Sequence, residues 1–325
     1  MKRIALDLMG SDKGPEELIK AVESFINKYQ DVTFFAVGKK EKIDCLKGKC
    51  ELVYADDVLG MEDGALEVMR KKEASMLKAV SLVAEGKADA VVSAGSTGGF
   101  ISSCSIKLRL VKGVERAALV SPFPKSNGDK VVLLDIGANN ENNASHLVNF
   151  AKMGRVFASI YLDKKDLNLY LLSNGAEEKK GSPVVKEAHQ MLKDKNFAGF
   201  KGNMEARYVM NGDADVVVCG GYEGNIFLKG SEGAIKLFSN LMKDAFKSSI
   251  FSKMGYLLSR KGFAKMKQTV DYKNYGGAIL LGVNGVAVKA HGSSDARCFE
   301  SAIKLAYQML DLEMLKKIKE DVAND

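Results

Sequence analysis

Residues 88–100 read Ala88-Asp89-Ala90-Val91-Val92-Ser93-Ala94-Gly95-Ser96-Thr97-Gly98-Gly99-Phe100, a short apolar run that breaks into glycine, serine and threonine before an apolar helix pattern. The run predicts a buried strand. Small residues let the backbone approach a ligand closely, and the free N–H groups at a helix start favour negative charge. The stretch therefore indicates either an anion-binding loop or a turn whose glycines serve only close packing.

The order of strand, loop and helix recurs along the chain. Pro15 followed by two acidic residues is typical of a helix first turn, and Ser75 is a candidate cap for a helix that ends near Gly86. Strands are expected at 4–9, 32–37, 52–54, 167–172, 197–200, 216–219, 277–281 and 286–289. Helices are expected at 144–160, at 183–192, from Asn225 onward and at 295–310. This alternation is typical of a mostly parallel sheet covered on both faces.

One place breaks the alternation. Asn127-Gly128 lies between the apolar runs 117–120 and 131–135, which predicts an antiparallel hairpin. We therefore expect an α/β fold, a doubly wound α/β/α sandwich whose mostly parallel sheet carries an antiparallel hairpin. The expected organisation is a single large α/β domain over residues 1–325.

Composition places the protein among globular proteins of the cytoplasm. The 325 residues are 46% hydrophobic, and no apolar run reaches the length of a membrane span. The N-terminus runs directly into a strand pattern that contains Asp7, unlike a signal peptide. Five scattered cysteines without a C-x-x-C pair fit reduced thiols.

The net charge of +7 is concentrated in one segment, because residues 241–268 hold seven basic residues against one acid. This distribution favours a local anionic partner over nucleic acid. The segment 236–270 is expected to form a basic amphipathic helical excursion, with Met242, Phe246, Ile250 and Met254 four residues apart. The segment is either ordinary core or an exposed tip that touches a dimer mate or an anionic membrane. The tip residues would be Phe246, Ile250, Phe251, Leu257, Leu258 and Lys261.

The loops that follow the predicted strands share small residues, amides, hydroxyls and an occasional lysine, a lining that suits phosphate and a polarised carbonyl. The sequence has no G-x-S-x-G, G-x-x-x-x-G-K-[ST], G-x-G-x-x-G or H-E-x-x-H motif. With three histidines in the whole chain, a histidine-based metal site is not expected. The remaining candidate is a reaction in which the bound anion itself attacks, so that the protein positions and polarises.

At this point the residues resemble a family, the PlsX type of acyl-[acyl carrier protein]:phosphate acyltransferase. The resemblance runs nearly end to end. It is carried by Met9-Gly10-Ser11-Asp12, Val92-Ser93-Ala94-Gly95-Ser96-Thr97-Gly98, Leu134-Asp135-Ile136-Gly137-Ala138-Asn139, Phe150-Ala151-Lys152-Met153-Gly154, Glu177-Glu178-Lys179-Lys180-Gly181, Ala214-Asp215-Val216-Val217-Val218, Gly224-Asn225, Tyr275-Gly276-Gly277-Ala278 and Lys289-Ala290-His291-Gly292-Ser293-Ser294.

The resemblance implies synthesis of acyl phosphate from inorganic phosphate and acyl-carrier-protein thioester, for phospholipid synthesis and without a cofactor. It implies an isocitrate/isopropylmalate dehydrogenase-like fold, a homodimer, and peripheral contact with the membrane, where a membrane acyltransferase would use the acyl phosphate. Three positions depart from the family pattern: Ser11 and Ser96, where the family has Gly and Asn, and Gly220, where the family has an acid.

The expected site joins a phosphate cradle to groups that polarise the thioester carbonyl. Lys180, Asn225 and His291 are the catalytic candidates: Lys180 offsets the charge of phosphate, Asn225 holds phosphate or the oxyanion, and His291 protonates the leaving sulfur or binds phosphate. The candidates for binding phosphate are Asp12, Ser93, Gly95, Ser96, Thr97, Gly98, Asn139 and Gly224.

Each candidate has a plain structural alternative. Asn139 and Asn225 are also suited to loop or cap positions, Lys180 to a solvated position, and His291 to a hydrogen-bonded structural role. Asp12 and Asp135 are at least as suited to holding loop N–H groups as to chemistry. Two rival functions also stay open: a phosphate acyltransferase that uses acyl-coenzyme A, and a non-catalytic protein that docks acyl carrier protein.

Overall fold

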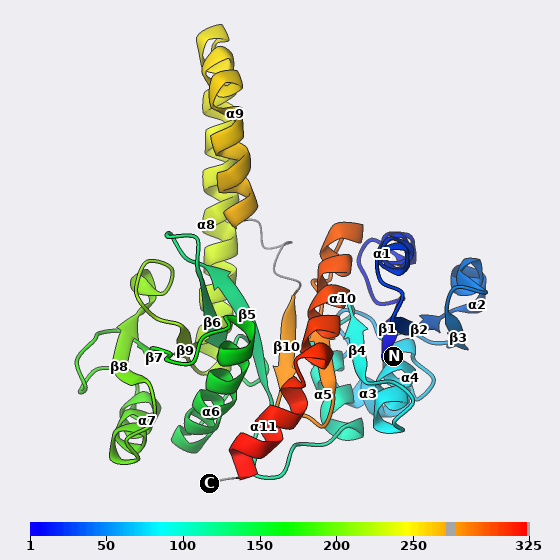
Figure 1. Cartoon of the computed structure of the whole chain (residues 1–325), viewed down its shortest axis with the longest axis horizontal. Helices are drawn as coiled ribbons and strands as arrows, with labels where there is room; N and C mark the ends of the chain where they lie inside the picture. Colours follow the sequence, from blue (N-terminus) through cyan, green and yellow to red (C-terminus); the bar gives the residue numbers. More distant parts are fainter. Residues whose placement is uncertain (271–276, 324–325) are drawn as a thin grey trace.

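The computed structural model describes residues 1–270 and 277–323 and contains one sheet of 11 strands (Figure 1). The strand order is β3-β2-β1-β4-β11-β10-β5-β6-β9-β7-β8. The strands are β1 Lys2–Asp7, β2 Val32–Gly38, β3 Glu51–Tyr54, β4 Ala90–Ser93, β5 Ala118–Pro124, β6 Lys130–Leu134, β7 Leu169–Ser173, β8 Phe200–Glu205, β9 Val216–Val218, β10 Ala278–Leu281 and β11 Val286–Lys289.

The sheet consists of two parallel sets that run in opposite directions. Strands β1 to β4 and β11 are parallel to one another, as are β6, β9, β7 and β8. Between the sets lie β10 and β5, and each of the pairs β11–β10, β10–β5 and β5–β6 is antiparallel. Val120 of β5 is aligned with Ile279 on one side and with Leu134, the last residue of β6, on the other. The carboxyl ends of the two sets therefore face each other across the middle of β5.

Helices cover both faces of the sheet and make a three-layer structure. One face packs against α1 Pro15–Lys28, α6 Ala144–Tyr161, α7 Pro183–Asp194, α10 Ala296–Asp311 and α11 Met314–Ala323. The other face packs against α3 Ala65–Arg70, α4 Ser75–Ala84, α5 Thr97–Lys107 and the first turns of α8 Gly221–Lys247. The short helix α2 Lys40–Ile43 packs beside β2 at one end of the sheet.

The expected fold class is confirmed: the protein is a mixed α/β structure with a mostly parallel sheet. The Asn127-Gly128 turn joins β5 and β6 as the predicted antiparallel hairpin. Two local predictions are wrong. The strand expected at 197–200 begins at Phe200, and Ser75 is the first residue of α4, with Ala74 as its cap. The Ser75 hydroxyl instead donates a hydrogen bond to the Asp7 carboxylate at 2.7 Å.

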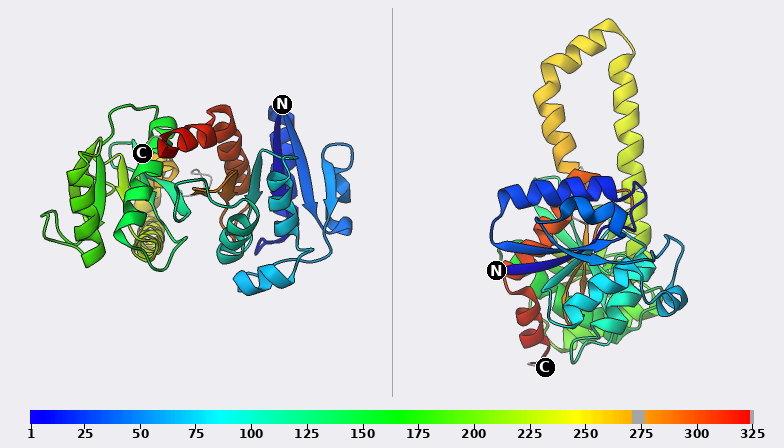
Figure 2. Two further views of the ribbon diagram at one scale, coloured as in Figure 1. Left: turned by 90° about the horizontal axis from the view of Figure 1, so that it is seen from below. Right: turned by 90° about the vertical axis from the view of Figure 1, so that its right-hand side faces the viewer.

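The basic segment forms a helical hairpin that stands clear of the sheet (Figures 1 and 2). The hairpin consists of the outer part of α8 and of α9 Ile250–Val270, joined by a turn at residues 248–249. The apolar stripe expected through Met242, Phe246, Ile250 and Met254 is therefore wrong as one helical face, because the turn interrupts it. Among the described residues, no helix has both the length and the apolar composition needed to cross a bilayer.

Apolar side chains of the hairpin divide into an inner cluster and an exposed set. The rings of Phe246, Tyr256 and Phe263 contact one another, with centroids 4.7–5.8 Å apart, and tie α8 to α9. By contrast, Ile250, Leu257, Phe251 and Leu258 face solvent, the last two being 81% and 86% exposed. Two helices alone leave these side chains uncovered. The side chains of Lys265 and Lys267 lie outside the described residues.

The junction between the two strand sets depends on Asp135, which follows β6 and is fully buried. One of its carboxylate oxygens accepts hydrogen bonds from the backbone N–H groups of Leu119, Gly137 and Ala138 at 2.8–3.1 Å. The other oxygen accepts from the backbone N–H and the side-chain amide of Asn139 at 3.0 and 2.8 Å. The carboxylate thereby fixes the loop after β6 to β5.

We expect Asp135→Asn to lower the free energy of unfolding by about 2–4 kcal/mol, because an amide offers one acceptor oxygen and leaves buried N–H groups without partners. Urea denaturation followed by circular dichroism measures the change. The control Asp166→Asn replaces an exposed carboxylate before β7 and should shift stability by less than about 0.5 kcal/mol. Equal stabilities for the two variants would contradict the role assigned to Asp135.

Candidate functional site

Three loops from the first strand set meet at the carboxyl ends of β1, β4 and β11. A Cβ added at Gly10 would lie 2.5 Å from the Cα of Gly95, so the backbones of the loops after β1 and β4 are in direct contact. The N–H of Asp12 donates to the carbonyl of Gly292 at 3.0 Å, which joins the loop after β11. The structure therefore brings together the predicted residues Asp12, Gly95 and His291.

A buried polar network lies beneath these loops. The Ser93 hydroxyl donates to the Asp7 carboxylate at 2.7 Å and accepts from the N–H of Gly95 at 3.1 Å. Lys289 is also buried; burial lowers its pKa to about 8, against the opposing effect of Asp7. Its ammonium group donates to the carbonyl of Ala290. In this structure both the Ser93 hydroxyl and the Gly95 amide support the loop from within.

The start of α5 presents two amides. The Ser96 hydroxyl accepts from the N–H of Gly99 at 3.2 Å and donates to the carbonyl of Asp63 at 3.0 Å, so this side chain caps the helix. Thr97 and Gly98 form the exposed first turn. Their N–H groups have no partner in the described part of the chain, as expected for a helix start. These two amides are the donors that remain for an anion.

His291 lies in the loop after β11, in which the carbonyl of Gly292 accepts the N–H of Asp12. Its Nδ1 accepts the N–H of Ser293 at 3.2 Å, so the neutral ring carries its proton on Nε2. Nε2 lies 4.0 Å from the carboxylate of Glu232 on α8. Burial, followed by the nearby Lys229 ammonium, lowers the pKa of His291, which is therefore neutral at pH 7.

A second group of predicted residues gathers around Asp135. A Cβ at Gly224 would lie 1.9 Å from the carbonyl oxygen of Asp135, so this glycine serves close packing of α8. The Asn139 side-chain amide donates both to Asp135 and to the carbonyl of Ala117, each at 2.8 Å. No N–H of that amide is left for phosphate or an oxyanion, and we assign Asn139 to holding the loop. Asn225, in contrast, is exposed on α8 beside Gly137.

Helix α8 connects the two groups. It begins at the carboxyl end of β9, carries Asn225 in its second turn, and reaches His291 with Lys229 and Glu232. Residues four apart on a helix share a face, and the rise from Asn225 to Glu232 is about 10 Å. Sequence reasoning missed Lys229, although its spacing of four from Asn225 is a signal that could have found it.

Lys180 is placed apart from these groups. It is exposed on the loop after β7, where it contacts its own loop and where Asn203 of β8 donates to its carbonyl at 3.5 Å. No contact among the described residues joins its ammonium group to Asn225 or to the loop of Gly95. At Gly220, where the family pattern has an acid, the carboxylate of Glu223 occupies the adjacent space: a Cβ at Gly220 would lie 2.4 Å from it.

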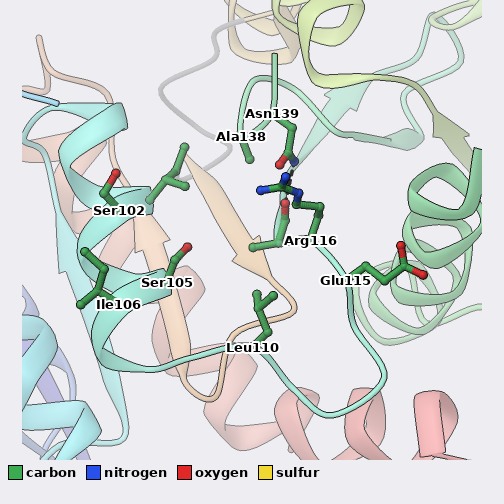
Figure 3. A pocket seen from close by; sticks show the side chains of 10 residues that line it. Ser102, Ser105, Ile106, Leu110, Glu115, Arg116, Ala138 and Asn139 are labelled. Atoms are coloured by element: carbon green, nitrogen blue, oxygen red, sulfur yellow. Dashed lines mark hydrogen bonds between the residues drawn. The ribbon is translucent and has the colours of Figure 1, made fainter. Parts of the chain in front are cut away.

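A cavity of about 340 Å³ opens between α5 and the two loops that precede β5 and follow β6 (Figure 3). Ile101, Ser102 and Ile106 line it from α5, and Arg116 and Asn139 line it from the other side. Residue type and spacing do not predict this cavity, because it depends on how far apart two elements lie that are distant in the chain. Asn139 and residues of α5 thus line the same cavity.

Sequence comparison relates nearly the whole chain to one group of enzymes. Residues 2–317 match the family described as fatty acid synthesis protein. A phosphate acyltransferase of Exiguobacterium sp. is 39% identical over 329 residues, covering 99% of this chain and 100% of that protein. A phosphate acyltransferase of Aliarcobacter butzleri is 40% identical over 308 residues, covering 93% of this chain and 92% of that protein.

Solved structures share the fold at low sequence identity. A phosphotransacetylase from Streptococcus pyogenes superposes with a TM-score of 0.64 at 17% identity, covering 95% of this chain and 94% of that one. A 4-hydroxythreonine-4-phosphate dehydrogenase from Klebsiella pneumoniae reaches a TM-score of 0.53 at 13% identity, covering 94% and 99%. These likenesses concern the fold, whereas the sequence matches decide the family. The chain belongs to the fatty acid synthesis protein family, the PlsX type of phosphate acyltransferase, and is an acyltransferase of that family.

Proposed function

We propose that this protein forms acyl phosphate from inorganic phosphate and the acyl thioester of acyl carrier protein, as an entry to phospholipid synthesis. The proposal is supported by the placement of three kinds of donor near the carboxyl ends of the two strand sets, which α8 connects. These donors are the amides of Thr97 and Gly98, the Nε2–H of His291 with the nearby Lys229, and the amide of Asn225. Membership of the phosphate acyltransferase family supplies the reaction class.

In the proposed step, an oxygen of phosphate attacks the carbonyl carbon of the thioester. A carbon–oxygen bond forms, the carbon–sulfur bond breaks, and the thiolate leaves as a thiol with the proton that the attacking hydrogen phosphate gives up. The helix start and Lys229 hold the phosphate, while Asn225 donates to the oxyanion that develops on the carbonyl. Holding two reactants in this geometry supplies effective molarities of about 10⁵–10⁸ M, so no covalent enzyme intermediate is needed. No cofactor enters the step.

We assign Lys180 no direct contact with phosphate, because it contacts its own loop and Asn203 in this structure. His291 is neutral at pH 7 and so serves better as a hydrogen-bond donor to phosphate than as a charged acid. Asp12 is exposed beside Gly292, where its carboxylate would repel a bound anion. We therefore assign Asp12 to orienting the loop after β11 rather than to binding phosphate. We favour Lys229 as the cation, although its ammonium group pairs with Glu232 at 2.9 Å in this structure and would have to exchange that carboxylate for phosphate.

The donor distinguishes this proposal from its two rivals. We expect thiol release from palmitoyl-acyl carrier protein to require inorganic phosphate, to yield acyl phosphate in equal amount, and to exceed release from palmitoyl-coenzyme A by at least about tenfold in kcat/KM. A thiol-reactive dye and ³¹P NMR measure the two products. Preference for the coenzyme A thioester would identify a coenzyme A-dependent enzyme. Binding of acyl carrier protein without any acyl phosphate would identify a docking protein.

Removal of the Asn225 amide tests the assigned oxyanion donor. We expect Asn225→Ala to lower kcat by about 10²–10³-fold with a smaller change in KM, because the donor acts mainly on the transition state. The control Asn240→Ala makes the same change on the same helix, several turns away, and should leave kcat within twofold. Equal turnover by the two variants would remove Asn225 from the mechanism.

We further propose that the protein is a cytoplasmic homodimer that contacts anionic membrane through the α8–α9 hairpin, where a membrane acyltransferase could receive the acyl phosphate. Support comes from apolar side chains that two helices cannot cover, such as Phe251 and Leu258, beside Lys253, Arg260 and Lys261. Phe246 is not part of that surface, because it packs between the two helices.

We expect Lys253→Glu combined with Lys261→Glu to weaken binding to anionic vesicles about tenfold to thirtyfold, since each basic residue near such a surface contributes about 1 kcal/mol. Sedimentation with vesicles measures binding, and light scattering measures the dimer. The control pair Lys304→Glu and Lys319→Glu makes the same charge change on exposed positions of α10 and α11. Unchanged sedimentation would reject membrane contact, and loss of the dimer would show that the surface packs against a second copy.

A further inference from the structure

The cavity between α5 and the loops that precede β5 and follow β6 lies next to the proposed site. Its lining follows α5 from Ile101 through Ser102 and Ser105 to Ile106, which begins one turn after the amides of Thr97 and Gly98. Figure 3 shows Asn139 and Ala138 at one end and Leu110 at the other. A helix rises 1.5 Å per residue, so the lining on α5, which ends at Ile106, reaches about 13 Å from the helix start at Thr97. A molecule bound at the helix start can therefore extend into this cavity.

The lining is mainly apolar, and its space is created by small residues. Ile101, Ile106 and Leu110 contribute the larger apolar side chains, whereas Ser102 and Ser105 occupy positions on α5 where a longer side chain would close the gap. A volume of about 340 Å³ lies at the lower end of the range of small-molecule sites. No carboxylate forms an ion pair with Arg116 among the described residues, and Figure 3 shows this side chain beside Asn139. The cavity thus combines an apolar part with a polar side that carries both Arg116 and Glu115, whose carboxylate accepts from the Ser145 hydroxyl at 2.8 Å.

We propose that this cavity is the acyl-chain subsite, in which the chain lies along α5 with its carbonyl next to Asn139 and its far end at Leu110. The inference rests on the proposed function and extends it to the apolar part of the substrate. Thr97, Gly98 and Asn225 then hold the reacting end, while Arg116 places positive charge beside the phosphate of the product. The cavity is the feature that gives preference among chain lengths, because each buried methylene raises affinity about fourfold.

Filling the cavity at two depths tests the subsite. Ser102→Phe fills the part near the reacting end, and Leu110→Trp fills the far end. We expect Leu110→Trp to lower kcat/KM for palmitoyl donors at least about tenfold more than for butyryl donors, and Ser102→Phe to lower kcat/KM for both, because it fills the part that the first carbons of any chain occupy. Lys107→Phe is the matched control, because Lys107 is exposed on α5 outside the lining. The control should keep the chain-length preference of the unmodified protein.

A direct binding measurement separates this inference from the proposed function. We expect a fluorescent long-chain fatty acid to bind the unmodified protein and the Lys107→Phe variant alike, and to bind Ser102→Phe at least about tenfold more weakly. That result supports the subsite even if no acyl phosphate forms, which would defeat the proposed function alone. Equal binding by all three proteins overturns the subsite. An equal loss of kcat/KM for butyryl and palmitoyl donors in Leu110→Trp also overturns it, because the far end of the cavity then holds no part of the acyl chain.

Discussion

The carboxylate of Asp135 is the interaction on which the site depends. It gathers four backbone N–H groups and one side-chain amide at the end of β6, and one of those N–H groups belongs to β5. β5 pairs with β10, and β10 pairs with β11 of the other parallel set. The carboxylate thereby ties the loop after β6 to strands that lead to the other set. Its charge is used for structure. The close approach of α8 at Gly221 and Gly224 follows from the position of the same residue.

Opposed parallel sets explain how loops far apart in the chain form one site. In a sheet whose strands all point one way, ligands bind beyond a single edge. Here the carboxyl ends of the two sets face each other near the middle of β5, and α8 extends from one to the other. The helix thereby brings Asn225 and Lys229 to bear on the loops of Thr97 and His291. The cavity along α5 continues from the same place and gives the apolar part of an amphiphilic substrate somewhere to lie.

Local patterns predicted much of this structure. Most strands, the hairpin at Asn127-Gly128 and a loop-holding role for Asp135 follow from residue type and spacing, because these are decided within a few residues. The direction of the second strand set could not be predicted, since periodicity carries no information on which strand pairs with which. Residue type alone also predicts a ligand-binding role for Ser93, Ser96 and Asn139. Their side chains instead make hydrogen bonds within the protein, to partners that lie far away in the sequence. Lys180 and Lys229 look alike in sequence, and only packing distinguishes them.

The central claim is that the two strand sets and α8 form one anion site at their junction. A crystal structure of the protein soaked with inorganic phosphate tests this claim most directly. The account predicts a phosphate within hydrogen-bond distance of the amides of Thr97 and Gly98, with Nε2 of His291 and the side chains of Lys229 and Asn225 turned toward it. Phosphate bound beside Lys180 alone, with the junction empty, would contradict the account.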